Sequence, residues 1–222
     1  MEFPDSAGVM ILNNCDLFPL SRLPLFIFEP RYRTMLADAL ESHRMFCLAL
    51  RRPDSAREQP CEVAGLGLVR VSVQNTNGTS NLVLQGLTRV RLGKAVQTRP
   101  YRVHLIEPLI PEPTDSLVAD ALVARTLELV EARLKFGNPL PLAVVTQLSS
   151  DDTVGPPQIE NLIRALDRIG DPGTLADLVA RLFLPDPMMR QLILQTVNIE
   201  ERLRHLVHFL VEEVARTSND ND

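Results

Sequence analysis

The sequence predicts an α+β protein in which a β-rich part, residues 1–110, precedes a helical part, residues 111–222. In the first part, short apolar segments alternate with turn residues, which is typical of antiparallel strands. From about residue 115 the apolar residues recur at helical spacing instead. The charge changes nearby: residues 1–107 contain 13 Lys and Arg against 10 Asp and Glu, whereas residues 108–222 contain 10 against 18. The two parts therefore differ in both secondary structure and charge.

The first strands and one early helix are predicted within the first 42 residues. An apolar strand is expected over residues 9–12. The run LFPLSRLPLFIFEPRYR, residues 17–33, then predicts a strand, a turn, a second strand and the start of a helix over residues 30–42. Pro30 suits the first helical position, because the N–H that it lacks would have no helical partner there.

The rest of the β-rich part consists of short strands joined by turns. A phase slip in the alternation beside Gly65 and Gly67 indicates either a bulge or a strand that is buried on both sides. Asn77-Gly78 is a strong hairpin signal, and Gly86 is expected to end the strand that follows. Six or so short strands with one helix favour a small closed or partly closed barrel. The strands are predicted over residues 45–50, 63–73, 81–85 and 101–106, with Val90 and Leu92 continuing the sheet and residues 51–60 forming a surface loop.

The helical part is divided by glycine, proline and capping residues. Gly137 and Asn138, with Pro139 just beyond, end its first helix. Thr174, with Asp177 three residues later, is predicted to cap the helix that begins there. Helices are predicted over residues 115–136, 158–169, from 174 onward, 188–197 and 199–216, with an irregular segment over residues 141–157.

Candidate catalytic and metal-binding residues are few, and each has a structural explanation. His205 and His208, with Glu201 and Glu212 a turn to either side, are potential metal ligands. Their helical positions oppose the apolar stripe, however, which indicates a solvated face. Cys47 lies inside an apolar strand, where a buried thiol is inert. We therefore predict no catalytic residue, no metal site, no cofactor and no enzymatic activity.

The composition also limits the location and the partners. The longest apolar run has about six residues, far short of the roughly 20 that cross a membrane. The N-terminus has no signal-peptide pattern, and three widely spaced cysteines do not suggest a disulfide framework. A net charge of −5 argues against nucleic-acid binding. We expect a cytoplasmic protein with no membrane partner.

Glu29, Arg31, Tyr32 and Arg33 form a concentrated polar cluster at the start of the predicted early helix. In a purely structural interpretation, Glu29 interacts with the helix dipole. Either arginine could then pair with Glu29 or cover the barrel with its aliphatic stem. In a functional interpretation, the same corner borders a polypeptide-binding groove. The residues alone leave both interpretations open.

Residues 17–33 resemble the opening signature of the Lon N-terminal (substrate-binding) domain family, whose pattern is close to LFP…LPL.IFEPRYR. The resemblance departs at Leu194-Gln195, where the family commonly reads LE, and at residues 9–12, which differ from the usual LPLFPL-like start. Otherwise it continues in order along nearly the whole chain. The further matching segments are VAGLG at residues 63–67, VLQGLTRVRL at residues 83–92, and residues 101–109, 171–180 and 190–203.

The resemblance implies a PUA-like β pseudo-barrel followed by a helical subdomain. In the family's full-length proteases, this domain precedes an ATPase module and a Ser–Lys protease domain, so the chain resembles a stand-alone relative. The implied function is non-catalytic binding of unfolded or partly folded polypeptides, with a protease or chaperone as a further partner. RNA binding is the alternative, because PUA-like barrels often bind RNA, and a small-ligand pocket in the barrel mouth is a third. The expected polypeptide-binding residues are Phe26, Phe28, Glu29, Arg31, Tyr32 and Arg33, and the expected RNA-binding residues are Arg70, Arg89, Arg91, Arg99 and Arg102.

Overall fold

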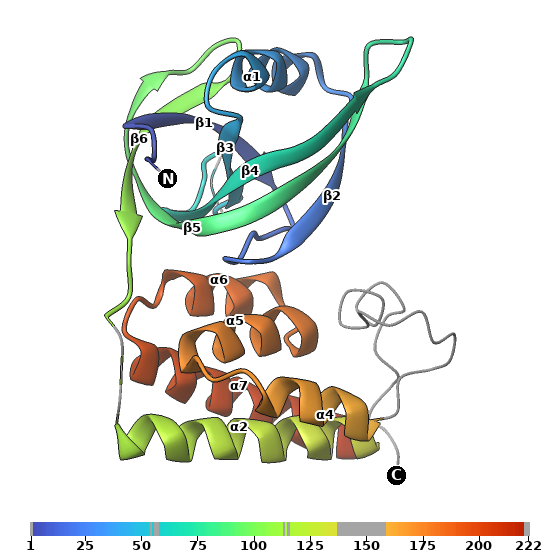
Figure 1. Ribbon diagram of the computed structural model, residues 1–222, viewed down its shortest axis with the longest axis vertical. Coiled ribbons are helices and arrows are strands. Elements are labelled where there is room, and N and C mark those ends of the chain that lie inside the picture. Colours follow the sequence, from blue (N-terminus) through green and yellow to red (C-terminus); the bar gives the residue numbers. More distant parts are fainter. Residues whose placement is uncertain are drawn as a thin grey trace. The chain divides into compact units, whose positions relative to one another are not determined.

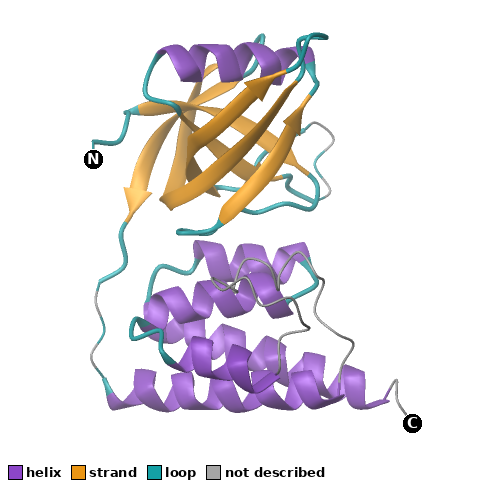
Figure 2. Ribbon diagram, turned by 45° about the vertical axis from the view of Figure 1, so that its right-hand side comes forward, coloured by secondary structure: helices purple, strands orange, loops and turns teal. Residues whose placement is uncertain are grey.

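The computed structural model describes residues 2–53, 55, 58–112, 114, 116–136 and 159–219. The chain divides into two compact units, Met1–Ile110 and Pro111–Asp222, called here the barrel unit and the helical unit. The barrel unit holds the strands and one helix, and the helical unit holds the other helices (Figures 1 and 2). The α+β class is thereby confirmed. Within the described ranges, no helix is both long and apolar enough to span a bilayer.

The barrel unit is a six-stranded sheet that closes on itself. Its strands have the order β2-β5-β4-β3-β1-β6, and β5 also pairs with β6, which closes a ring of β5, β4, β3, β1 and β6 and leaves β2 as an edge strand beside β5. β1 and β3 are parallel, and the other pairs are antiparallel. The elements are β1 Ser6–Leu12, β2 Arg22–Ile27, α1 Pro30–Glu41, β3 Met45–Leu50, β4 Val63–Gln74, β5 Ser80–Gln97 and β6 Arg102–Leu109.

Closure depends on the length of β5, which has 18 residues. Its first part pairs with β2 through residues 80–85, and its second part pairs with β6 through residues 89–97. The prediction that Gly86 ends this strand is therefore wrong. A Cβ atom at Gly86 would lie 2.0 Å from the carbonyl oxygen of Phe18. Glycine is required here because another backbone segment passes against the strand, and not because the strand stops.

That neighbouring segment is the first half of the apolar run at residues 17–33. Leu17 and Phe18 are buried but form no strand, so the predicted strand before the turn is wrong, and β2 is the one strand of the run. A Cβ atom at Gly65 would lie 2.0 Å from the carbonyl oxygen of Leu17. The segment thus packs its backbone onto two strand glycines, and a sequence pattern cannot distinguish this from strand pairing.

The bulge and the hairpin predicted for this region are confirmed. Register shifts in the β4–β5 pair occur between Leu66 and Gly67 and again between Val69 and Val71. At the hairpin, Gly78 has a φ of +79°, which glycine adopts without strain. The N–H of Asn75 donates to the carbonyl of Thr79 at 2.8 Å and closes the turn.

Strands β1 and β3 are buried on both faces, since alternate side chains enter two separate apolar clusters. Val9 and Cys47 belong to one cluster, and Met10 and Phe46 belong to the other. Helix α1 supplies the second cluster with side chains from its inner face and lies across one end of the barrel (Figure 1). Pro30 is the first residue of α1, as predicted, and follows Glu29 at the N-cap.

The helical unit contains five described helices: α2 Leu117–Phe136, α4 Ile159–Asp167, α5 Pro172–Phe183, α6 Pro187–Gln195 and α7 Ile199–Asn219. The N-cap of α5 is Asp171, whose carboxylate accepts a hydrogen bond from the N–H of Thr174 at 2.6 Å. The prediction that Thr174 is the cap is therefore wrong, because Asp171 precedes Pro172 and satisfies the free N–H. The segment over residues 141–157 lies outside the described residues.

A buried ion pair joins α5 to α7. Arg202 is fully buried, and its Nη1 lies 3.3 Å from the Oδ1 of Asp177, which is also buried. The other guanidinium nitrogens donate to backbone carbonyls, Nε to Thr196 at 2.8 Å and Nη2 to Val197 at 3.1 Å. Sequence periodicity placed only apolar residues on the inner face of α7. This charged anchor was not predicted, since an arginine beside an apolar stripe looks the same whether it faces inward or outward.

Candidate functional site

Strand β2 has one apolar face in the core and a second face in solvent. Leu23, Leu25 and Ile27 point inward and pack in the cluster beneath α1. Pro24 and Phe26 point outward, and Phe26 is 54 % exposed. An aromatic side chain at this position contributes little to the core. Its exposure is the first sign of a surface that serves another purpose.

The strand register extends the exposed apolar surface across β5 and β4. Residues directly opposite one another in an antiparallel pair share a face of the sheet. Pro24 faces Val83, and Val83 faces Val71. Phe26 faces Asn81, and Asn81 faces Val73 in the same way. We call this surface the outer face and define it as Arg22, Pro24, Phe26, Phe28, Arg70, Val71, Val73, Asn81, Val83 and Gln85.

The most prominent feature of the outer face is a pair of stacked phenylalanines. The ring centroids of Phe26 and Phe28 lie 6.0 Å apart with an interplanar angle of 27°. Phe28 is 60 % exposed, and Val71 and Val73 are more than half exposed. Large apolar side chains scattered singly are ordinary on protein surfaces, but a contiguous set on one sheet face marks an interaction site.

Strand β2 is also an edge strand, since it pairs with β5 on one side. An unpaired edge can accept another strand, and proteins commonly blunt such edges with proline. Pro24 lies in the middle of β2, and a proline within a sheet directs its nitrogen away from the neighbouring strand. The free edge therefore lacks a donor at its centre.

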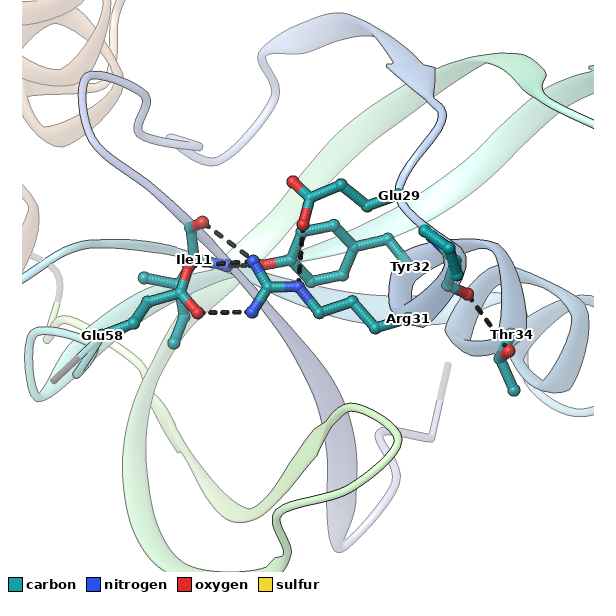
Figure 3. A network of polar contacts seen from close by, with 7 residues as sticks. Ile11, Glu29, Arg31, Tyr32, Thr34 and Glu58 are labelled. Carbon is teal, nitrogen blue, oxygen red and sulfur yellow. Dashed lines mark hydrogen bonds and ion pairs between the residues drawn. The ribbon is translucent and has the colours of Figure 1, made fainter.

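The polar cluster at the start of α1 forms a network that holds the loop before β4 (Figure 3). Arg31 Nε donates to the carboxylate of Glu29 at 2.9 Å. Its two terminal nitrogens bind both carboxylate oxygens of Glu58, and the bond from Nη2 measures 3.0 Å. Arg102 adds a bond of 2.8 Å to the carbonyl oxygen of Glu58. The hydrogen bonds to the Glu58 carboxylate raise the pKa of Arg31.

Tyr32 is an internal anchor and is not available to a ligand. It is 5 % exposed, and its hydroxyl accepts a hydrogen bond from the N–H of Ile11 at 3.0 Å. The Tyr32 hydroxyl also lies 3.3 Å from the carbonyl oxygen of Ile11, to which it donates. Burial raises the pKa of Tyr32, and the Arg31 guanidinium lies 4.4 Å from its ring centroid. Strand β1 is thereby tied to the first turn of α1 (Figure 3).

The six residues predicted for the site thus divide into two groups and one separate residue, Arg33. Phe26 and Phe28 lie on the outer face, whereas Glu29, Arg31 and Tyr32 hold the adjoining helix. Arg33 is exposed and lies beside the β4–β5 turn, since its Nη2 would be 2.0 Å from a Cβ atom at Gly78. Sequence reasoning missed Val71, Val73 and Val83. Alternation alone puts Val69, Val71 and Val73 on one face, and only the second register shift, between Val69 and Val71, turns the last two valines outward.

The Glu58 network predicts how the stability of the barrel unit depends on pH. The hydrogen bond from Arg31 lowers the pKa of Glu58 below its ordinary value of 4.5. The stabilisation is therefore complete above pH 4.5 and is lost as the pH falls through the lower, folded-state pKa. We expect wild-type protein to be more stable than Glu58→Gln at neutral pH, with the difference shrinking below pH 4.5.

Both tyrosines of the chain lie in the barrel unit, and the chain has no tryptophan. Urea unfolding followed by tyrosine fluorescence therefore reports on this unit. Glu62→Gln is the matched control, because Glu62 is mostly exposed and lies 3.5 Å from Arg52, a weak surface pair. A constant difference between wild type and Glu58→Gln from pH 7 to acid would contradict the assignment.

The other residues considered as candidates were a catalytic cysteine and metal-ligating histidines. Cys47 is fully buried, and burial raises the pKa of its thiol to about 12, so it is protonated at neutral pH. His208 is exposed and lies 3.3 Å from Glu212 on the same helix. Among the residues that the structure describes, no group of three or more His, Cys, Asp or Glu side chains is placed to hold a metal ion.

The arginines proposed for RNA binding do not form one exposed basic face. Arg89 is only 3 % exposed. Arg91 pairs with Glu107 at 3.1 Å, and Arg102 donates to the carbonyl oxygen of Glu58. Arg70 lies on the outer face instead. Burial therefore removes Arg89 from any exposed surface that the five could share, and Arg91 is already paired with a carboxylate.

The barrel with its capping helix, followed by a helical unit, is the architecture of a Lon-type N-terminal domain. Residues 8–212 match the family described as the ATP-dependent protease La (LON) substrate-binding domain. The chain belongs to this family. The resemblance noted from residues 17–33 is thus confirmed across nearly the whole sequence.

Two relatives and two solved structures illustrate the similarity. The chain is 33 % identical over 219 residues to Lon protease from Citrifermentans bemidjiense, covering 97 % of this chain and 25 % of the relative. It is 32 % identical over 209 residues to Lon protease 2 from Sorangium cellulosum, covering 90 % and 24 %. The N-terminal domain of Mycobacterium avium complex Lon protease superposes with a TM-score of 0.68 at 20 % identity, covering 93 % of this chain and 98 % of that domain. For the Lon N-terminal domain protein from Xanthomonas campestris the TM-score is 0.59 at 16 % identity, with 92 % and 98 % covered.

The chain spans about a quarter of the length of the curated relatives that it matches. The matched region is the substrate-binding part of those proteases, and the family description refers to substrate binding alone. The comparisons therefore bear on recognition, and they assign no catalytic step to the residues of this chain.

Proposed function

We propose that the protein binds unfolded or partly folded polypeptide segments on the outer face of the barrel unit. The observation that carries this proposal is the exposed, stacked pair Phe26 and Phe28 beside Val71, Val73 and Val83. Unfolded chains expose apolar side chains that folded proteins bury. A contiguous apolar sheet face can therefore distinguish the two states without reading a particular sequence.

The contacts are proposed to be made by side chains lying on the face. Pro24 removes a backbone donor from the middle of the free edge, which disfavours a continuous ladder with an added strand. The Arg31 network and the buried Tyr32 hydroxyl fix the start of α1, and with it the backbone that carries Phe28. A preorganised aromatic pair loses little conformational entropy when a segment binds.

The proposed role is non-catalytic and belongs in the cytoplasm. Binding of a segment by itself neither cleaves nor unfolds a polypeptide. The domain is therefore proposed to deliver its bound chains to a protease or chaperone, or to shield them from aggregation. The family match to a substrate-binding domain supports this role.

The direct test compares one model protein in two states. A reduced and carboxymethylated protein, which stays unfolded, is labelled with fluorescein and titrated with the chain while anisotropy is measured. We expect saturable binding with a dissociation constant on the order of micromolar, and no binding of the native, disulfide-bonded form. Equal binding of both forms, or none of the unfolded form at a hundredfold higher concentration, would refute the proposal.

A further inference from the structure

The outer face carries two arginines as well as apolar side chains, and both arginines lie at the same end of it. Arg22 faces Gln85 across the β2–β5 pair. The side-chain oxygen of Gln85 accepts a hydrogen bond of 2.5 Å from Nε of Arg70, on the neighbouring β4. Arg22 and Arg70 therefore flank Gln85 from the two neighbouring strands, next to the row of Pro24 and Val83. Phe26 and Phe28 lie further along β2, away from the arginines.

Neither arginine is neutralised. Among the residues that the structure describes, neither Arg22 nor Arg70 forms an ion pair, whereas Arg31 and Arg91 elsewhere in the barrel unit do. The hydrogen bond from Arg70 goes to a neutral amide. None of the ten residues of the outer face carries a carboxylate, although the whole chain has a net charge of −5. This face is locally cationic on an anionic protein.

We propose that the outer face selects polypeptide segments in which an apolar or aromatic stretch lies next to Asp or Glu. This inference rests on the proposed function and specifies its substrate class. From Phe26 to Arg22 is four residues of extended strand, a distance of about 13 Å. A segment lying along β2 would therefore place its acidic residues about four positions from its apolar anchors.

The physical basis is charge complementarity at the rim of an apolar contact. Exposed ion pairs are individually weak and are screened by salt. Two such pairs are expected to improve affinity about fivefold at low ionic strength. Arg22 and Arg70 would also disfavour segments that carry Lys or Arg at this position, because like charges repel one another.

Three fluorescein-labelled peptides test the proposal. Each carries the same Phe- and Val-containing stretch, followed four positions later by two Glu, two Ser or two Lys. At an ionic strength of about 0.05 M, the Glu peptide is expected to bind about fivefold more tightly than the Ser peptide, and the Lys peptide more weakly. The differences should largely disappear at about 1 M salt, where the Debye length is about 3 Å.

The double variant R22Q/R70Q is expected to bind all three peptides with the affinity that the Ser peptide has for wild type. Arg91→Gln is the matched control, because Arg91 is exposed on the same unit, lies off the outer face and pairs with Glu107. It should keep the preference for the Glu peptide. A preference unchanged in R22Q/R70Q, or lost equally in Arg91→Gln, would overturn the assignment to these two arginines.

Failure of the inference is distinguishable from failure of the proposed function. If all three peptides bind equally well, the charge preference is wrong and polypeptide binding stands. If none binds, both are wrong. If single-stranded RNA binds in a manner that depends on Arg22 and Arg70 but not on Phe26 and Phe28, the occupant is a nucleic acid and the inference is overturned. A dimer that hides the outer face, seen by light scattering and dissociated by replacing the two phenylalanines, would overturn it as well.

Discussion

Replacing Phe26 and Phe28 together with serine is expected to weaken binding of an unfolded polypeptide by about 30- to 150-fold. The two rings are the largest exposed apolar groups on the outer face, and central aromatic side chains commonly dominate binding energy. Removing both rings corresponds to a loss of about 2–3 kcal/mol in binding free energy. The measurement is anisotropy with the labelled, carboxymethylated protein used to test the function.

The matched control is Val96→Ser/Leu105→Ser, because Val96 is 55 % exposed and Leu105 is 45 % exposed, outside the outer face. This control also replaces two exposed apolar side chains with serine. It should leave the dissociation constant within about twofold of the wild-type value. Tyrosine fluorescence during urea unfolding verifies that each variant keeps a folded barrel unit. Unchanged affinity in a folded Phe26→Ser/Phe28→Ser variant would show that the polypeptide binds to a surface other than the outer face.

Replacing Arg202 with methionine is expected to destabilise the helical unit by about 3–5 kcal/mol. The substitution keeps much of the side-chain volume but removes the guanidinium that faces the buried Asp177 carboxylate. Removing one partner of a buried ion pair costs far more than the net strength of the pair. Urea unfolding followed by circular dichroism at helical wavelengths measures the change, since most helices belong to this unit.

A double-mutant cycle separates the pair from the packing. Arg202→Met/Asp177→Leu should cost less than the sum of the two single changes, because it leaves no charge buried at this position. Arg204→Met is the control, since Arg204 is half exposed and pairs with Glu200 one turn away at 3.3 Å. That surface pair is worth about 0.3–0.5 kcal/mol. Equal losses in Arg202→Met and Arg204→Met would mean that burial of Arg202 does not matter.

The local features of the fold were predictable because their signals are short in sequence. Pro30 marked the start of α1, and Asn77-Gly78 marked the β4–β5 turn. Each depends on the backbone preferences of one or two residues. Of the site, Phe26 and Phe28 were named from the sequence, although exposure of the two rings could not be read from it.

The errors arose where distant segments meet. Gly86 looked like the end of a strand because glycine weakens strands, but it accommodates the backbone at Phe18. Tyr32 looked available at a helix start, but its hydroxyl bonds the backbone of Ile11, 21 residues earlier. Sequence patterns report the preferences of a residue within its own element. They contain no information on which other segment will approach it.

The sequence by itself therefore determined that a β-rich part precedes a helical part, the family, and the position of the aromatic pair in the chain. Only the tertiary structure decided that β2, β5 and β4 align Phe26, Val83 and Val71 on one solvent-facing surface. It alone also decided that Arg22 and Arg70 border that surface while Arg89 is buried. The physical reason is that strand register and burial result from contacts between residues far apart in the chain, which no local pattern encodes.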